Sequence, residues 1–142
     1  MQIFKTLSCL LVVTLLVSSV SFSQKISRPG AGAPGTWKLL GTVDAQHTAD
    51  HDVIVVAGPH DYFRQLKFKV TNSPLNMQRM VVTYDDGGLP ENINIRFNIP
   101  QGGESRVIDL KGGKRKLKAV HFWYDTKGFL KGRADVTLFG IK

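Results

Sequence analysis

Hydrophobic and polar residues alternate with a period of two over much of the chain, a pattern typical of β-strands with one buried face. The clearest case is the segment 93–99, whose apolar positions are Ile93, Ile95, Phe97 and Ile99. In the segment 63–71, lysines occupy positions between the apolar ones. Glycine, proline, aspartate and asparagine separate such segments at intervals of about ten residues, as expected for turns.

The alternation predicts eight strands after the N-terminal segment and no helix. They are residues 37–41, 52–57, 63–71, 75–84, 93–99, 106–110, 115–124 and 133–140. Many short strands with regular turn signals are typical of antiparallel sandwiches. We therefore expect an all-β fold, a single antiparallel β-sandwich of jelly-roll type.

The segment 115–124 keeps its alternation only if it contains one extra residue. The apolar positions of one face are Val120, Phe122 and Tyr124. Leu117 is out of phase with them by one residue. A β-bulge inserts one residue into a strand and shifts the alternation. We predict such a bulge near Lys118 and Ala119.

The N-terminus has the features of a cleaved secretory signal peptide. Lys5 is followed by an apolar run at 7–17, and small residues at 21 and 23 predict a cut after Ser23. The run is shorter than the ~20 residues that span a bilayer, so we expect no membrane span. The cut would remove Cys9, the only cysteine, so the mature chain would have no disulfide. These features predict a bacterial periplasmic or secreted protein.

The residues after the predicted cut divide into two parts. Residues 24–35 contain glycine and proline without apolar periodicity, which is typical of a flexible linker. The alternating segments all lie within residues 36–142, which we expect to form one domain.

Positive charge is concentrated in the last quarter of the chain. The formal net charge is +8, and residues 106–142 contain ten lysines and arginines against three aspartates. The candidate anion-binding residues are Arg106, Lys111, Lys114, Arg115, Lys116 and Lys118. One interpretation is binding of an anionic polysaccharide or another envelope polymer. The other is a solvated turn and strand face that keeps the domain soluble and protects a sheet edge from strand addition. Export makes nucleic acid an unexpected partner.

Three further groups of residues suggest chemistry, and each has a simpler explanation. The spacing of His47, Asp50, His51 and Asp52 fits neither a zinc nor a calcium motif, so we expect a polar loop without metal or cofactor. Trp37 and Trp123 could stack on sugars, but packing is the usual role of such residues. Ser105 and His121 could serve a hydrolase acting on envelope glycans, but no nucleophile elbow surrounds Ser105. We therefore expect no catalytic residues and no enzyme activity.

Several segments together resemble a known family. They are WKLLG at 37–41, DHDVIVV at 50–56, FRQLKFKV at 63–70, VVTYDDGG at 81–88 and SRVIDLKGGKRKL at 105–117. This order is similar to that of small exported bacterial proteins in the domain-of-unknown-function family DUF2541. The resemblance implies an exported all-β domain and no particular activity. Our expectation is a non-enzymatic module with a structural or binding role in the cell envelope, and the oligomeric state stays open.

Overall fold

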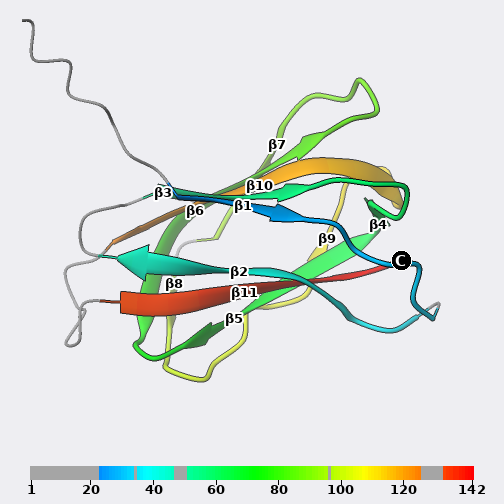
Figure 1. Cartoon of the computed structure of the whole chain (residues 1–142). Helices are drawn as coiled ribbons and strands as arrows, with labels where there is room; N and C mark the ends of the chain where they lie inside the picture. The colour runs from blue at the N-terminus through cyan, green and yellow to red at the C-terminus, as the bar shows by residue number, and fades with distance from the viewer. Residues whose placement is uncertain (1–22, 34, 47–50, 96, 126–132) are drawn as a thin grey trace, which may run out of the picture.

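The computed structural model describes residues 23–33, 35–46, 51–95, 97–125 and 133–142 (Figure 1). The described residues form strands and contain no helix. The strands are β1 (Ser23–Ser27), β2 (Lys38–Gln46), β3 (His51–Val56), β4 (Tyr62–Phe63), β5 (Gln65–Thr71), β6 (Leu75–Tyr84), β7 (Glu91–Ile93), β8 (Phe97–Ile99), β9 (Ile108–Asp109), β10 (Arg115–Asp125) and β11 (Arg133–Ile141). The expectation of an all-β fold is confirmed for this part of the chain.

The strands form two sheets that lie face to face (Figure 1). Sheet A has seven strands in the order β1-β3-β10-β6-β7, with β4 paired to β10 and β8 paired to β6. Sheet B has four strands in the order β2-β11-β5-β9. The chain therefore crosses repeatedly between the two layers, and β10 and β11 take inner positions in their sheets.

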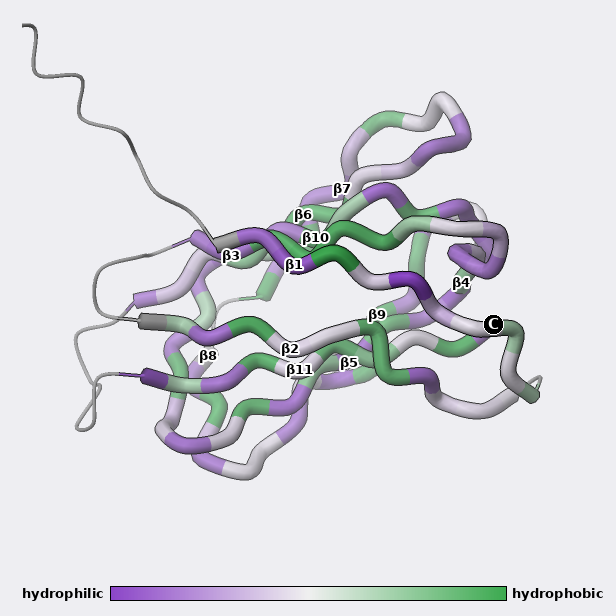
Figure 2. The backbone as a smooth tube through the Cα atoms, viewed as in Figure 1, coloured by the Kyte–Doolittle hydropathy of each residue, from purple (hydrophilic) through white to green (hydrophobic). Residues whose placement is uncertain are grey.

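One hydrophobic core fills the space between the sheets. Along the strands, hydrophobic and hydrophilic residues alternate (Figure 2), and the inward side chains of both sheets belong to a single buried cluster. Phe122 of sheet A contacts Phe68 of sheet B edge to face, with ring centroids 5.7 Å apart. Burying apolar surface from both layers is the main favourable contribution to holding them together.

The predicted bulge in the segment 115–124 is confirmed. The pairing of β10 with β6 shifts register between Leu117 and Ala119. The shift allows Leu117 to be buried together with the residues of the predicted inward face, which are Val120, Phe122 and Tyr124. A second shift lies between Trp123 and Tyr124.

The segment 93–99 is not one continuous strand. Its two ends form β7 and β8, which pair with different parts of the same neighbour, β6. Ile93 pairs with Met80 and Phe97 with Met77, so four residue steps lie opposite three. The extra residue interrupts the ladder, although the predicted inward residue Ile95 is buried. The alternation therefore predicted the burial of Ile93, Ile95 and Ile99 correctly, but it did not predict the interruption of the strand.

The ordered structure begins earlier than the composition predicts. The first residues of the expected linker lie in β1, which pairs in parallel with β3 at the edge of sheet A. The backbone N–H of Ala57 also donates a hydrogen bond to the carbonyl oxygen of Ser27, at 2.8 Å. Ile26, the apolar residue of β1, is 54% exposed, so the segment lacks the alternating buried apolar positions by which a sequence predicts a strand. The predicted signal peptide, except Ser23, lies outside the described residues and stays a prediction.

Within the described residues, no helix has the length and hydropathy that crossing a membrane requires.

Candidate functional site

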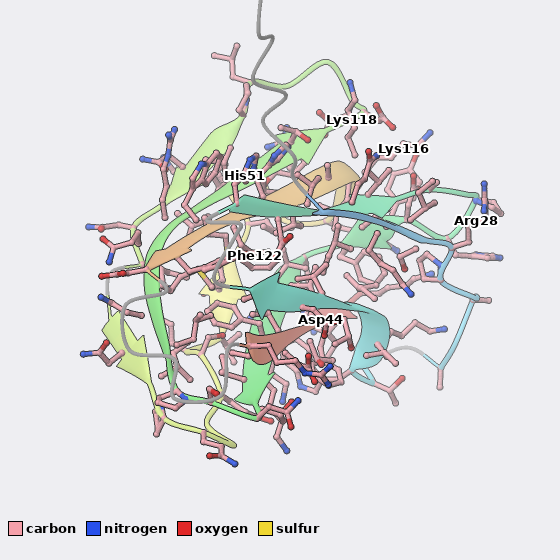
Figure 3. All side chains as sticks on the ribbon, turned by 60° about the vertical axis from the view of Figure 1, so that its left-hand side comes forward. Arg28, Asp44, His51, Lys116, Lys118 and Phe122 are labelled. Carbon is pink, nitrogen blue, oxygen red and sulfur yellow. The ribbon has the colours of Figure 1, made fainter. Side chains whose placement is uncertain are left out.

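Cationic side chains gather at one end of sheet A, where β9 leads into β10. Gly112 and Gly113 have φ values of 88° and 80°, which let the chain reverse there. Arg28 belongs to the same end because the residue before it, Ser27, pairs with Val56 of β3, and the adjacent Val55 pairs with Ala119 of β10. Figure 3 shows Arg28 along the same end as Lys116 and Lys118. We call these residues the basic end: Arg28, Lys111, Lys114, Lys116 and Lys118.

Arg115 lies within this group but is occupied by contacts inside the protein. Its Nε and Nη2 donate to the two carboxylate oxygens of Asp86 at 2.8 and 2.9 Å. Its Nη1 donates to the carbonyl oxygen of Lys111 at 3.1 Å, and its guanidinium lies 3.6 Å from the centroid of the Tyr84 ring. The hydrogen bonds that Asp86 accepts from Arg115, and one from the Gly88 N–H, lower the pKa of Asp86 to about 2. Arg115 therefore orders the turn.

Glu91 holds the turn from the other side. Its side chain is buried, and its Oε1 accepts hydrogen bonds from the Tyr84 hydroxyl at 3.0 Å and from the Lys111 N–H at 2.8 Å. Burial, followed by the hydrogen bond to Glu91, raises the pKa of Tyr84 above its ordinary value. The lysines at 111 and 114 therefore project from a turn whose backbone is held by the Glu91 carboxylate and the Arg115 guanidinium.

The structure separates Arg106 from the other predicted anion-binding residues. Arg106 follows Ser105, whose N–H donates to the carbonyl oxygen of Phe68 in β5 of sheet B. The side chain of Arg106 is exposed. Five of the six predicted residues thus meet at one end, and Arg28 joins them. Arg28 was missed because the sequence pattern did not predict β1.

The position of β10 contradicts the edge-protection interpretation. Lysines discourage strand addition when they lie on an edge strand. Lys116 lies opposite Tyr62 of β4, and β10 continues between β3 and β6. The two lysines of β10 therefore do not protect a sheet edge, and this explanation of the basic residues is wrong for them.

Few acidic groups near the basic end are left to neutralise it. Asp86 is engaged by Arg115, and Glu91 by Tyr84 and the turn. Asp85 is exposed and its N–H donates to the Lys116 carbonyl oxygen. Among the described residues, the ion pairs are Lys67–Glu104, Arg115–Asp86 and Arg133–Asp135. None of them involves a residue of the basic end.

A second feature lies on the outer face of sheet A. His51 of β3, Trp123 of β10 and Arg79 of β6 are in register across three neighbouring strands. The His51 and Trp123 rings are parallel within 4° with centroids 4.3 Å apart, and the Arg79 guanidinium lies 4.8 Å from the Trp123 ring centroid. We call His51, Trp123 and Arg79 the stacked row. Because its neighbours reach it from both sides, the Trp123 ring offers no free face for sugar stacking.

His121 lies beside the stacked row, two residues before Trp123. His51 Nε2 and His121 Nδ1 are 3.3 Å apart. Burial, and then the charge of His51, lowers the pKa of His121. The sequence alternation placed His121 and Trp123 opposite the core residues, but only the pairing of β3 with β10 brings His51 to them.

The predicted polar loop around residues 47–52 is only partly described. His47 and Asp50 lie outside the described residues, whereas His51 and Asp52 begin β3 and point to opposite faces of it. Asp52 is buried between the sheets, where its Oδ2 accepts a hydrogen bond from the Tyr124 hydroxyl at 2.8 Å. The described residues contain no group of three or more potential metal-ligating side chains.

The structure does not bring Ser105 and His121 together. The Ser105 hydroxyl accepts a hydrogen bond from the Phe68 N–H at 3.0 Å and donates one to the Arg106 carbonyl oxygen at 2.8 Å. Ser105 lies beside sheet B, whereas His121 lies on the outer face of sheet A. These two residues therefore do not form a nucleophile and base pair.

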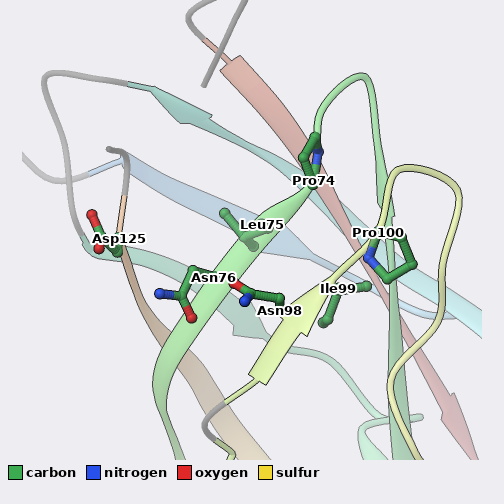
Figure 4. Close-up of a pocket in the computed structure, with 7 residues that line it drawn as sticks. All are labelled: Pro74, Leu75, Asn76, Asn98, Ile99, Pro100 and Asp125. Carbon is green, nitrogen blue, oxygen red and sulfur yellow. The ribbon is translucent and has the colours of Figure 1, made fainter. Parts of the chain in front are cut away.

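A hollow of about 490 Å³ opens at the start of β6 (Figure 4). Its apolar lining comes from Pro74, Leu75, Ile99 and Pro100. Asn76 and Asn98, which are register partners, and Asp125 add polar groups. Among the described residues, its lining contains no cation that would complement an anionic polymer.

Two carboxyl groups lie opposite each other on the outer face of sheet B. Asp135 of β11 pairs with Asp44 of β2, and Asn72 Nδ2 donates to Asp135 Oδ2. Burial, then a hydrogen bond and repulsion from Asp44, raise the pKa of Asp135 to about 6, and Arg133 opposes the shift. A folded-state pKa above the ordinary 3.8 means that stability is present below about pH 4 and lost as pH rises through 6.

The change Asp135→Asn removes this unfavourable ionisation while keeping an acceptor for Asn72. We expect the variant to be more stable than wild type by about 1–2 kcal/mol at pH 7.5, with the difference disappearing below about pH 4. Urea unfolding of the variant and the wild type at both pH values measures this difference in the free energy of unfolding. An equal difference at both pH values would contradict the assigned pKa.

The comparisons with known proteins agree with the resemblance in the sequence. No curated protein and no solved structure matches the chain. The model of the domain of unknown function DUF2541 matches residues 9–140, which is nearly the whole chain. The predicted family is confirmed: the chain belongs to the DUF2541 family.

Proposed function

We propose that this protein is an exported, non-enzymatic module of the cell envelope that binds an anionic polysaccharide or glycolipid through the basic end. The fold in this proposal is a jelly-roll β-sandwich. The sheet orders β2-β11-β5-β9 and β3-β10-β6-β7 support it, because the jelly roll is the sandwich in which the chain alternates between two sheets in this manner.

The observation that carries the proposal is that lysines project from an inner strand and from a turn with a fixed backbone. Lys116 and Lys118 lie on β10, where protection of a sheet edge does not explain them. The turn before them is held by Arg115 and Glu91. Holding cations close together in a fixed arrangement costs electrostatic free energy, which a polyanion would recover on binding.

The shape of the site favours an extended ligand over a small one. The residues of the basic end come from β10, from the turn before it and from the end of β1, so their charges are distributed over a surface. Lys111, Lys114 and Lys118 are exposed. A polymer with repeated phosphate, sulfate or carboxylate groups can contact several such cations at once, and each added contact raises the effective affinity.

Reversal of two charges on β10 tests the proposal. The double variant Lys116→Glu/Lys118→Glu is expected to bind heparin and lipopolysaccharide about tenfold or more weakly, because one lysine near an anionic surface contributes about 1 kcal/mol. Binding of the wild type should also weaken as salt is added. Affinity is measured by surface plasmon resonance at two salt concentrations.

A matched control distinguishes binding at the basic end from a general effect of the net charge of the protein. The variant Lys69→Glu/Arg106→Glu changes the net charge by the same amount on sheet B and on the segment beside it. It is expected to keep nearly all of the wild-type affinity. Equal losses in both variants would mean that only net charge matters, and an unchanged affinity in the β10 variant would exclude the basic end.

A further inference from the structure

We propose that His51 and His121 form a binding site for a divalent transition metal ion such as Cu²⁺ or Zn²⁺. The two residues lie on adjacent strands of sheet A, and His51 Nε2 faces His121 Nδ1 at 3.3 Å. A tetrahedral metal with metal–nitrogen bonds of about 2.0–2.1 Å holds two nitrogen ligands about 3.3–3.4 Å apart. The separation therefore already matches the distance between two ligands of one metal.

Imidazole ligates metals in its neutral form. Two neutral rings at this distance share one proton in a hydrogen bond. Metal binding would shift the ring protons to His51 Nδ1 and His121 Nε2, and both facing nitrogens would then ligate.

The surroundings fix the orientation of both rings. His51 is stacked on Trp123 at 4.3 Å, which restricts its rotation. His121 is half-buried, and its register partners on the two sides are Val53 and Val81. Arg79 lies on the Trp123 ring, on which His51 is also stacked, and Lys118 lines the same hollow as His121. Ligands held in place by their neighbours lose less conformational freedom when they bind a metal.

Two imidazoles leave other coordination positions open to water or an external ligand. Imidazole suits copper, zinc and nickel, and affinity at nitrogen sites is highest for Cu²⁺. Hard ions such as Mg²⁺ and Ca²⁺ prefer oxygen ligands. The site is therefore expected to bind Cu²⁺ most tightly, then Zn²⁺, and to show no binding of Mg²⁺.

Trp123 provides a direct readout, because it is stacked on one of the two ligands. In a tag-free Trp37→Phe variant, Trp123 is the only tryptophan. Titration with Cu²⁺ is expected to quench its fluorescence in a saturable manner at one equivalent, with Mg²⁺ as the negative control. Electron paramagnetic resonance of the Cu²⁺ complex should show coupling to imidazole nitrogen.

His51→Gln and His121→Gln, each in the Trp37→Phe background, are expected to lose the saturable quenching and the nitrogen coupling. His60→Gln, in the turn between β3 and β4, is the matched control and should keep both. Zn²⁺ should raise the melting temperature of the wild type and of His60→Gln only. Unchanged one-equivalent binding in the two site variants, or no saturable binding in the wild type, would overturn the proposal. Lys118 lines the same hollow as His121, so the charge control here is Lys111→Glu/Lys114→Glu in the turn before β10. It should bind Cu²⁺ as wild type does, so failure of the polymer proposal would be seen separately.

Discussion

Replacing Phe122 with alanine is expected to lower the free energy of unfolding by about 3–5 kcal/mol. Phe122 is fully buried and contacts Phe68 of the opposite sheet. Its removal would eliminate a contact between the two layers and leave a cavity where neither sheet can collapse easily. Because small domains are stable by about 5–15 kcal/mol, the loss would be a large fraction of the total.

Urea unfolding of the variant and the wild type, followed by circular dichroism, measures this effect. Leu89→Ala is the control, because Leu89 is 85% exposed and its truncation should change stability by less than about 0.5 kcal/mol. Similar small changes in both variants would contradict a single core shared by the two sheets.

Replacing Glu91 with alanine is expected to destabilise the protein by about 2–3 kcal/mol, because hydrogen bonds to charged groups are among the stronger ones and a buried hydroxyl donor would be left unpaired. The affected donors are the Tyr84 hydroxyl and the Lys111 N–H. The same change should loosen the turn before β10 and weaken polymer binding, even though no cation is removed.

Glu91→Gln is the matched variant, since its side-chain carbonyl can accept the same two hydrogen bonds. It should retain most of the stability and of the ordering of the turn. Urea unfolding gives the stability, and hydrogen exchange at the amides of residues 111–115 reports the order of the turn. Wild-type exchange rates in Glu91→Ala would show that Glu91 does not hold the turn.

Alternation along single segments predicted the all-β fold and most buried positions. The bulge in β10 was predictable because Leu117 and Val120 are apolar but out of phase, and only an extra residue reconciles them. In the segment 93–99, the alternation continues through a break in the ladder. Such a break depends on the register with the neighbouring strand. The sequence of one segment carries no information about that register.

The candidate site was predictable only in part, for the same reason. Charge density along the sequence identified the lysines of the basic end, but not Arg28, whose position depends on the parallel pairing of β1 with β3. The assignment of Arg115 to a binding role overlooked Asp86, which is 29 residues earlier in the chain and reaches it across the fold. His51 and His121 are 70 residues apart, and no local pattern indicates their contact.

The inner position of β11 in sheet B has a consequence for the kinetics of folding. β11 lies between β2 and β5, and Thr42 and Thr137, whose hydroxyls are 2.9 Å apart, are 95 residues apart in the chain. During synthesis, β2 and β5 therefore emerge long before the strand that joins them. Pairings between residues distant in sequence slow folding because a long loop must close first. Sheet B is thus expected to form only after β11 has been synthesised, as a late and cooperative event.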